Sequence, residues 1–297
     1  MINDTESSIQ LFDDEGAIYM GAQRELQNCE IGIFGVPYDG TTSYRAGTRF
    51  GPAKIREVSS CLETFCPQQE LDLEDIKYAD LGALKISNGS PEPVIEKVIS
   101  GTKYLLEHNL KPIMLGGEHS ITYGAIKTIL KKYPDTILIQ LDAHADLRDE
   151  WLGEKHNHAC AMRRCLDIIP SKNLFQVGIR SGTKNEFKEL KKSGRLIKSN
   201  NKSIAENLKE RLSSYQKNPI YITIDLDWFD TSVIPGTGTP EPGGFFWKDF
   251  SEIINVVKNF NLVGGDIVEL APQYDISDCS SILAAKIVRS LILLASK

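Results

Sequence analysis

Six side chains that commonly bind metal ions are grouped in three short motifs of the sequence. The first motif is D-x-H-x-D, the second is D-x-D, and the third is a histidine within GGEHS. The members of the three motifs are His119, Asp142, His144, Asp146, Asp225 and Asp227. Residues two apart on an extended chain point the same way, so the members of one motif can face a single point.

This set of four carboxylates and two imidazoles contains no thiolate. Carboxylates buried together are unfavourable unless cations compensate their charge. One divalent ion would leave ligands unused, whereas two ions that share bridging carboxylates use them all. Oxygen-rich ligation with some imidazole suits manganese better than zinc, which prefers tetrahedral sites of His and Cys. We therefore expect two Mn²⁺ ions per chain, and such paired metals can activate a bridging water.

The segments that precede these motifs resemble buried strands. Alone, D-x-H and D-x-D are weak evidence, because surface loops and helix caps produce them by chance. Several runs rich in Ile, Val and Leu, however, are apolar on both faces, which is typical of strands in a parallel sheet. These runs cover 31–36, 112–117, 136–143, 174–179, 219–227 and 262–268. Three of them end in the metal motifs, and ligands bind just beyond the carboxyl ends of such strands.

Amphipathic segments at 203–215 and 249–260 place their apolar residues on one helix face and alternate with these strands. The alternation predicts an α/β fold, a three-layer α/β/α sandwich with a mainly parallel sheet. A TIM barrel is the competing architecture, and the uneven spacing of the units disfavours it. We expect a short N-terminal arm over residues 1–28 and a single catalytic domain over residues 29–297.

Charge and composition restrict the partners and the compartment. The net charge of −6 argues against a nucleic-acid partner, because phosphate-binding surfaces are usually basic. The start of the chain lacks the basic and apolar regions of a secretory signal. The apolar stretch at 281–297 is interrupted by Lys286 and Arg289 and is too short to span a bilayer. Scattered cysteines without a CxxC pair predict free thiols in a reducing cytoplasm.

Four segments together resemble one enzyme family. GVPYDGTTSYRAGTRFGPAKIRE (35–57), GGEHS (116–120), DAHADLR (142–148) and IDLDWFD…GTGTPEPGG (224–244) are similar to the ureohydrolases, which include arginases and agmatinases. The resemblance covers the chain from about residue 30 to its end. It implies the arginase-like α/β/α sandwich and a homo-oligomer, usually a trimer or a hexamer.

The resemblance also implies how the metal ligands are divided. His119, Asp142, Asp146 and Asp225 would bind one manganese ion. Asp142, His144, Asp225 and Asp227 would bind the other ion. Asp142 and Asp225 would then be the bridging ligands.

Three residues match the catalytic positions of the family. His158 fits the histidine that moves protons, a role suited to a group with a pKa near neutrality. His156 lies close by and is the alternative. Glu269 fits the glutamate that holds the guanidinium, since a carboxylate can pair with two of its N–H groups. Asp227 is expected to hydrogen-bond the attacking oxygen.

The segment 151–164, WLGEKHNHACAMRR, is similar to agmatinases and lacks the Ser-Gly-Asn-x-His stretch of arginases. The acidic residues Asp149, Glu150 and Glu154 would repel the α-carboxylate of arginine if they line the pocket. We therefore expect a small cationic guanidino substrate, agmatine, giving putrescine and urea. Arginine, guanidinobutyrate and other small guanidines stay open, as does a catalytically silent homologue. A metallophosphoesterase is disfavoured because the sequence has no G-N-H-E/D stretch.

One segment departs from the family pattern. After the second ligand strand the family commonly reads D-x-D-x-L-D-P, whereas this chain has Phe229 and Thr231 in place of Leu and Pro. The metal ligands are retained. The large side chains of Trp228 and Phe229 are expected to change the pocket wall and could shorten the pocket.

Overall fold

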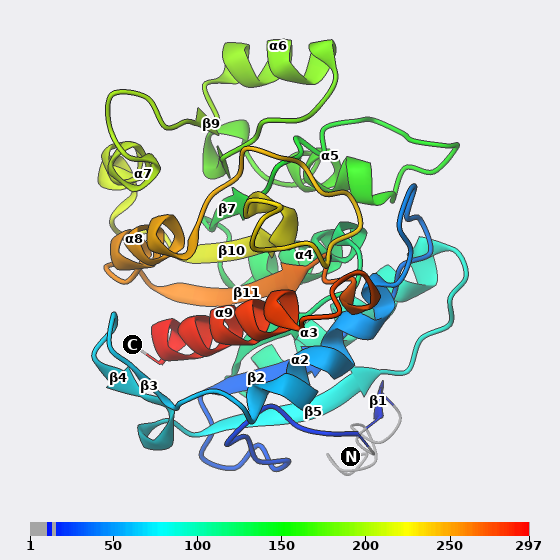
Figure 1. The fold of residues 1–297 in the computed structure, drawn as a ribbon, viewed down its shortest axis with the longest axis vertical. Coiled ribbons are helices and arrows are strands. Elements are labelled where there is room, and N and C mark those ends of the chain that lie inside the picture. Colours follow the sequence, from blue (N-terminus) through cyan, green and yellow to red (C-terminus); the bar gives the residue numbers. More distant parts are fainter. Residues whose placement is uncertain (1–10, 14–15, 297) are drawn as a thin grey trace.

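The computed structural model of the chain describes residues 11–13 and 16–296, and a nine-stranded sheet forms the centre of these residues (Figure 1). The strands in spatial order are β1 (Phe12–Asp13), β5 (Tyr78–Leu84), β2 (Ile31–Gly35), β6 (Lys111–Leu115), β11 (Leu262–Val268), β10 (Ile220–Asp225), β7 (Ile137–Leu141), β8 (Leu174–Val177) and β9 (Leu196–Ile197). Neighbouring strands are parallel except for β1, which is antiparallel to β5. A separate ribbon joins β3 (Phe65–Cys66) and β4 (Leu71–Asp72).

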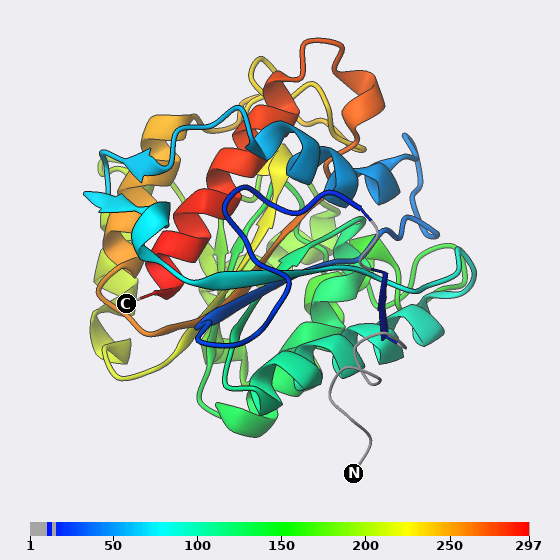
Figure 2. The same ribbon diagram turned by 90° about the horizontal axis from the view of Figure 1, so that it is seen from below.

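Helices cover both faces of the sheet, as the view in Figure 2 shows. One layer contains α2 (Gly51–Ser59), α7 (Ile204–Leu212), α8 (Trp247–Val257) and α9 (Cys279–Ala295), and the opposite layer contains α3 (Pro91–Glu107), α4 (Thr122–Lys132) and α5 (Ala161–Leu166). Beyond these layers, α6 (Lys184–Ser193) lies next to β9. Two apolar clusters form the core, one on each side of the sheet. The prediction of a three-layer α/β/α sandwich is therefore confirmed, and the open sheet replaces the alternative barrel.

All six predicted strands and both predicted helices are present, with ends that differ from the predicted ranges by a few residues. β1, β5 and β9 were not predicted. The apolar stretch near the end of the chain is the buried helix α9. Within it, the buried Arg289 donates hydrogen bonds to the carbonyl oxygens of Glu63 and Phe65. No helix in the described parts of the chain is long and apolar enough to cross a bilayer.

The predicted N-terminal arm lies partly outside the described residues, since residues 1–10 and 14–15 are not among them. Its described part packs against the domain. Phe12 pairs with Leu84 of β5, and the buried Tyr19 donates a hydrogen bond from its hydroxyl to the carbonyl oxygen of Ala285 at 2.8 Å. The boundary at residue 28 stays a prediction.

The cysteines at positions 29, 61, 66, 160, 165 and 279 are free thiols, as predicted. Cys160 is buried, and burial raises the pKa of its thiol to about 11. A thiol with so high a pKa stays protonated near neutral pH and is a poor nucleophile. Cys160 is therefore not expected to act as a nucleophile, although it follows His158 closely in the sequence.

Candidate active site

The candidate site lies at the carboxyl ends of four strands that are neighbours at the centre of the sheet, in the order β6, β11, β10 and β7. Each of these strands delivers polar side chains at its end. His119 follows β6, Glu269 follows β11, Asp225 ends β10 and Asp227 follows it, and the D-x-H-x-D motif follows β7. Because parallel strands end at the same edge, the topology brings together residues up to 150 positions apart, as between His119 and Glu269.

The turn after β6 requires the second glycine of GGEHS. A Cβ atom on Gly117 would lie 1.9 Å from the carbonyl oxygen of Tyr38, a contact that no side chain tolerates. Hydrogen bonds fix this approach, since the N–H of Glu118 donates to the carbonyl oxygen of Tyr38 and the N–H of Glu269 donates to that of Gly117. The close packing places His119 directly beside the ends of β10 and β11.

Two groups of potential metal ligands share one carboxylate. His119, Asp142 and Asp225 form the first group, and Asp142, His144 and Asp227 form the second. Within each group one ligand atom of every residue lies within 4.8 Å of the others. Asp142 is fully buried and belongs to both groups, so it is placed where a ligand bridging two cations would be.

The imidazole of His119 provides the clearest test of whether these residues fit a cation. Its Nε2 lies 2.9 Å from the hydroxyl of Thr223, which itself donates to the buried Asp266 at 2.5 Å. Since that hydroxyl proton is given to Asp266, Nε2 of His119 carries a proton, and Nδ1 is the nitrogen that could offer its lone pair to a cation. Nδ1 is buried and makes no hydrogen bond among the described residues, yet it faces oxygens of Asp142, Asp146 and Asp225 at 3.1, 3.1 and 3.4 Å. A lone pair facing carboxylate oxygens is stable when a cation lies between them.

The charges of the cluster support the same interpretation. Burial, together with the charges of Asp146 and Asp227, raises the pKa of Asp142 to about 7. Burial also raises the pKa of Asp225 well above its usual range. Burial opposes ionisation of Asp227 as well, but His144, whose Nδ1 lies 2.8 Å from Asp227 Oδ2, holds the pKa of that carboxyl at about 2. Without cations the site is stabilised by protons that divalent ions would replace.

Asp146, the sixth predicted ligand, has an unusual backbone conformation. Its φ is +52°, in the left-handed region that non-glycine residues seldom adopt. Such strain persists at functional sites where the surrounding structure determines the conformation. The structure therefore brings all six predicted ligands together, and their role as ligands stays a prediction.

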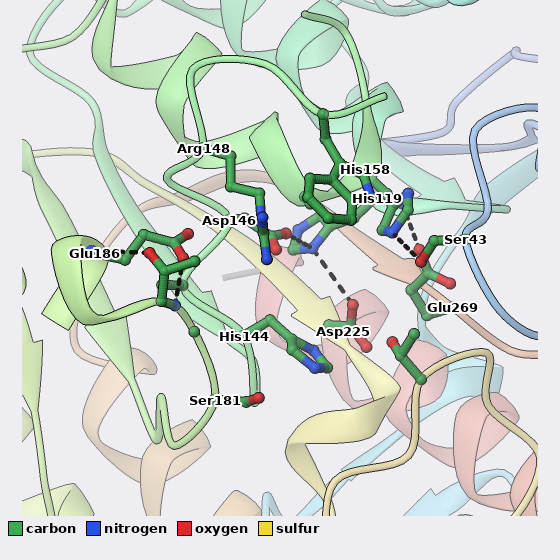
Figure 3. Close-up of a pocket in the computed structure, with 16 residues that line it drawn as sticks. Ser43, His119, His144, Asp146, Arg148, His158, Ser181, Glu186, Asp225 and Glu269 are labelled. Carbon is green, nitrogen blue, oxygen red and sulfur yellow. Dashed lines mark hydrogen bonds and ion pairs between the residues drawn. The ribbon is translucent and has the colours of Figure 1, made fainter. Parts of the chain in front are cut away.

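His158 lies beside this cluster and lines the same cavity (Figure 3). Its Nδ1 is 3.3 Å from the hydroxyl of Thr41, and its Nε2 is 3.3 Å from the hydroxyl of Ser43. Burial lowers its pKa, so the neutral imidazole dominates at neutral pH. The alternative, His156, packs against Tyr123 with the two ring centroids 5.3 Å apart and lines a different cavity. The geometry therefore favours His158 for proton transfer.

Behind His158 lies a buried carboxylate that the sequence analysis did not identify. Glu118 accepts hydrogen bonds from the backbone N–H and the hydroxyl of Thr41 at 2.7 and 2.6 Å, and from the hydroxyl of Ser120 at 2.6 Å. Burial raises the pKa of Glu118 to about 7, against the effect of these hydrogen bonds. The same Thr41 hydroxyl contacts His158, so Glu118 and His158 are linked through one side chain.

Glu269 uses only one of its two carboxylate oxygens for a hydrogen bond within the protein. Its Oε1 accepts a hydrogen bond from the backbone N–H of His119 at 2.8 Å. Its Oε2 has no hydrogen-bond partner among residues 11–13 and 16–296, and the side chain lines the cavity. The backbone φ of +67° is again left-handed. Glu269 thus offers a carboxylate oxygen to a cationic ligand.

The cavity between these residues has a volume of about 320 Å³. Six of the predicted residues line it and are labelled in Figure 3, namely His119, His144, Asp146, His158, Asp225 and Glu269. Sequence reasoning missed further lining residues, which are Ser43, Arg148, Trp151, Ser181, Thr183, Glu186 and Thr239. Thr239 belongs to the GTGTPEPGG loop, and its hydroxyl lies 3.4 Å from Asp227 Oδ2.

The acidic residues expected to line the pocket lie elsewhere. Asp149 is exposed and forms an ion pair with Arg164 at 2.7 Å. Glu150 and Glu154 line the separate cavity beside His156. These three residues do not line the cavity, so they cannot repel the α-carboxylate of arginine there.

The wall of the cavity contains a positively charged side chain instead, that of Arg148. The guanidinium of Arg148 lies over the ring of Trp151 at 3.9 Å and has no ion pair within the described ranges 11–13 and 16–296. An arginine that lies over an aromatic ring can still use the N–H groups at the edge of its guanidinium as donors. Arg148 is therefore a charged group of the cavity wall that is available to a ligand.

The family departure after β10 does not reach the cavity. Trp228 and Phe229 are fully buried, and Trp228 stacks on Phe245 at 4.6 Å. Neither residue lines the cavity, so the expected change of the pocket wall is wrong. Arg180 fixes the segment by donating to backbone carbonyl oxygens that include those of Asp227 and Trp228. The residues that differ from the family pattern therefore belong to the core and do not narrow the cavity.

Comparison with known proteins agrees with this arrangement. A family model described as the arginase family matches residues 29–294. The agmatinase of Bacillus anthracis is 39% identical over 287 residues, which is 95% of this chain and 98% of that protein. A human protein named mitochondrial guanidino acid hydrolase is 33% identical, over 91% of this chain and 79% of its own length.

A solved structure has the same fold over nearly the whole chain. The crystal structure of a putative agmatinase from Clostridium difficile superposes with a TM-score of 0.86 at 42% identity, and the match covers 92% of this chain and 99% of that one. Family model, sequence identity and fold agree over the segment that holds every candidate site residue. The chain is therefore a member of the arginase family.

Proposed function

We propose that this chain hydrolyses agmatine to putrescine and urea at a centre that binds two Mn²⁺ ions. As a member of the arginase family it is a hydrolase of C–N bonds in linear amidines. The observation that carries the proposal is the position of Glu269. Its free carboxylate oxygen lines the cavity that also contains the metal-binding cluster, so a guanidinium held there lies beside that cluster.

The metal centre is proposed from the donor set. His119, Asp142, Asp146 and Asp225 would hold one ion, and Asp142, His144, Asp225 and Asp227 would hold the other. Four carboxylates and two imidazoles without thiolates suit manganese. Paired cations supply an activated water near neutral pH, because they lower its pKa.

The protein side chains then have separate tasks. Glu269 Oε2 would accept N–H hydrogen bonds from the guanidinium and orient its carbon toward the attacking water. Asp227 would accept a hydrogen bond from that water. His158, neutral at rest, would take up a proton that originates from the attacking water and deliver it to the leaving nitrogen as the C–N bond breaks. The second water proton would reach the same nitrogen, so that the water oxygen remains on urea and the amine leaves as an ammonium.

Agmatine is proposed as the substrate because relatives named agmatinase are 36–39% identical over 95% of the chain. The segment 151–164 also resembles agmatinases. We further expect the chain to assemble as a trimer or hexamer in the cytoplasm, which sedimentation and fractionation would test.

Arg148 favours a second candidate, a guanidino acid. Its guanidinium lines the cavity without an ion pair among the described residues, and a terminal carboxylate could form a bidentate pair with it. The human relative named guanidino acid hydrolase is consistent with this candidate. An arginine in the wall would repel the ammonium of agmatine unless the distal end of that substrate points elsewhere.

Urea release measured side by side distinguishes the candidates. Agmatine and 4-guanidinobutyrate have four chain carbons and differ in the terminal group, so they form a matched pair, with arginine as third substrate. We expect kcat/KM to be highest for agmatine. A higher value for 4-guanidinobutyrate, lost in Arg148→Gln, would establish the second candidate. Absence of urea from all three substrates with manganese present would contradict the proposed function.

A further inference from the structure

We propose that Glu118 and Thr41 are positioning residues that keep the proton of neutral His158 on Nδ1 and leave Nε2 for proton exchange at the cavity. The inference rests on the proposed function, in which His158 protonates the leaving nitrogen. It assigns a task to a buried carboxylate that neither the metal ligands nor the guanidinium-binding group requires.

Glu118 acts on the hydroxyl of Thr41. The carboxylate is fully buried and receives three hydrogen bonds, two from Thr41 and one from Ser120, at 2.6 to 2.7 Å. An ionised carboxylate is an acceptor only. The single proton of the Thr41 hydroxyl is therefore donated to Glu118 Oε1, and the oxygen of that hydroxyl can only accept from its other neighbours.

Those neighbours are two nitrogens of His158. The backbone N–H of His158 donates to the Thr41 hydroxyl oxygen at 3.0 Å, and Nδ1 of the ring lies 3.3 Å from the same oxygen. An oxygen that has given away its proton forms a hydrogen bond with Nδ1 only if Nδ1 carries a hydrogen. The neutral ring therefore has its proton on Nδ1 and its lone pair on Nε2.

The other ring nitrogen faces a residue of the cavity wall. Nε2 lies 3.3 Å from the hydroxyl of Ser43, and both Ser43 and His158 line the cavity (Figure 3). A serine hydroxyl can rotate to donate or to accept, so Ser43 tolerates both protonation states of Nε2. When Nε2 gains a proton, the Nδ1–H bond to Thr41 becomes charge-assisted and stronger. The chain from Glu118 through Thr41 therefore sets the tautomer and stabilises the imidazolium.

The experiment removes the hydroxyl and keeps the shape. Thr41→Val is close to isosteric with threonine, whereas Thr41→Ser keeps the hydroxyl and loses the methyl group. The manganese-loaded enzyme is assayed with agmatine at pH 9. We expect Thr41→Val to lower kcat by ~10-fold, a part of the 10² to 10⁴ that general acid–base catalysis contributes. KM and bound manganese should change less than about twofold, and Thr41→Ser should retain most of the wild-type kcat.

A double-mutant cycle tests whether Thr41 acts through His158. In the His158→Ala background, Thr41→Val should cause no further fall in kcat, because the group it positions is gone. An equal fall in both backgrounds, a wild-type kcat in Thr41→Val, or a Thr41→Ser variant as impaired as Thr41→Val would each overturn the inference. His158→Ala with wild-type kcat would instead remove histidine from the proposed mechanism and the inference with it.

Discussion

Glu269→Gln separates recognition of the guanidinium from metal binding. Glutamine has the shape of glutamate, and its amide oxygen can still accept the hydrogen bond that the backbone N–H of His119 donates at 2.8 Å. The left-handed backbone at this position imposes the same strain on both residues. The substitution therefore removes the negative charge directed at the cavity and little else.

The expected cost follows from the contacts that are lost. Burial and the charge of Glu118 raise the pKa of Glu269 well above its usual range, so a cationic ligand is what favours its ionised form. A hydrogen bond to a charged group contributes about 1.5–3 kcal/mol, which corresponds to roughly 10- to 150-fold in kcat/KM. The glutamine amide would place N–H groups against the guanidinium N–H groups, so we expect the upper part of this range, about 100-fold.

The assay compares kcat/KM for agmatine with the manganese content of the same samples. We expect kcat/KM to fall while two manganese ions per chain are retained, because Glu269 is not among the proposed ligands. A variant with kcat/KM within about twofold of wild type and its metals intact would refute the assigned role of Glu269.

The remaining predictions concern the histidine and the metal-free protein. His158→Ala should lower kcat by ~10²-fold or more without loss of manganese, whereas His156→Ala should stay near wild type. Greater damage from His156→Ala would reverse the assignment. Without metal, the raised pKa of Asp142, about 7, and of His144, about 11, contribute stability at low pH that is lost as pH rises through those values. The melting temperature of the metal-free protein should therefore fall from pH 5 to pH 8, and manganese should restore it at pH 8; a rise over that interval would contradict the charge assignment.

The central strands were predictable because they are buried on both faces and read as continuous apolar runs. β5 was not, since Asp80 and Gly82 interrupt its apolar pattern. Asp80 is fully buried and pairs with Arg56 at 2.8 Å, and a partner 24 residues away cannot be identified from a local window. The two-residue strands β1 and β9 are too short to produce a pattern.

The candidate ligands were found because their spacing within each motif reflects the geometry of a strand end. The wall of the cavity has no such signature. Thr41 reaches His158 across 117 positions, and its contact depends on how two loops pack. The sequence shows Arg148 and Asp149 as neighbours, but only the structure shows that Arg148 lines the cavity while Asp149 is exposed and pairs with Arg164.

Titration of the metal-free protein with Mn²⁺, with urea release from agmatine followed at each step, tests the central claim most directly. We expect activity that rises to a plateau at two bound manganese ions per chain, because the two ligand groups share Asp142 and contribute residues to the wall of one cavity. Full activity at one ion per chain, or no urea at saturating manganese, would contradict it.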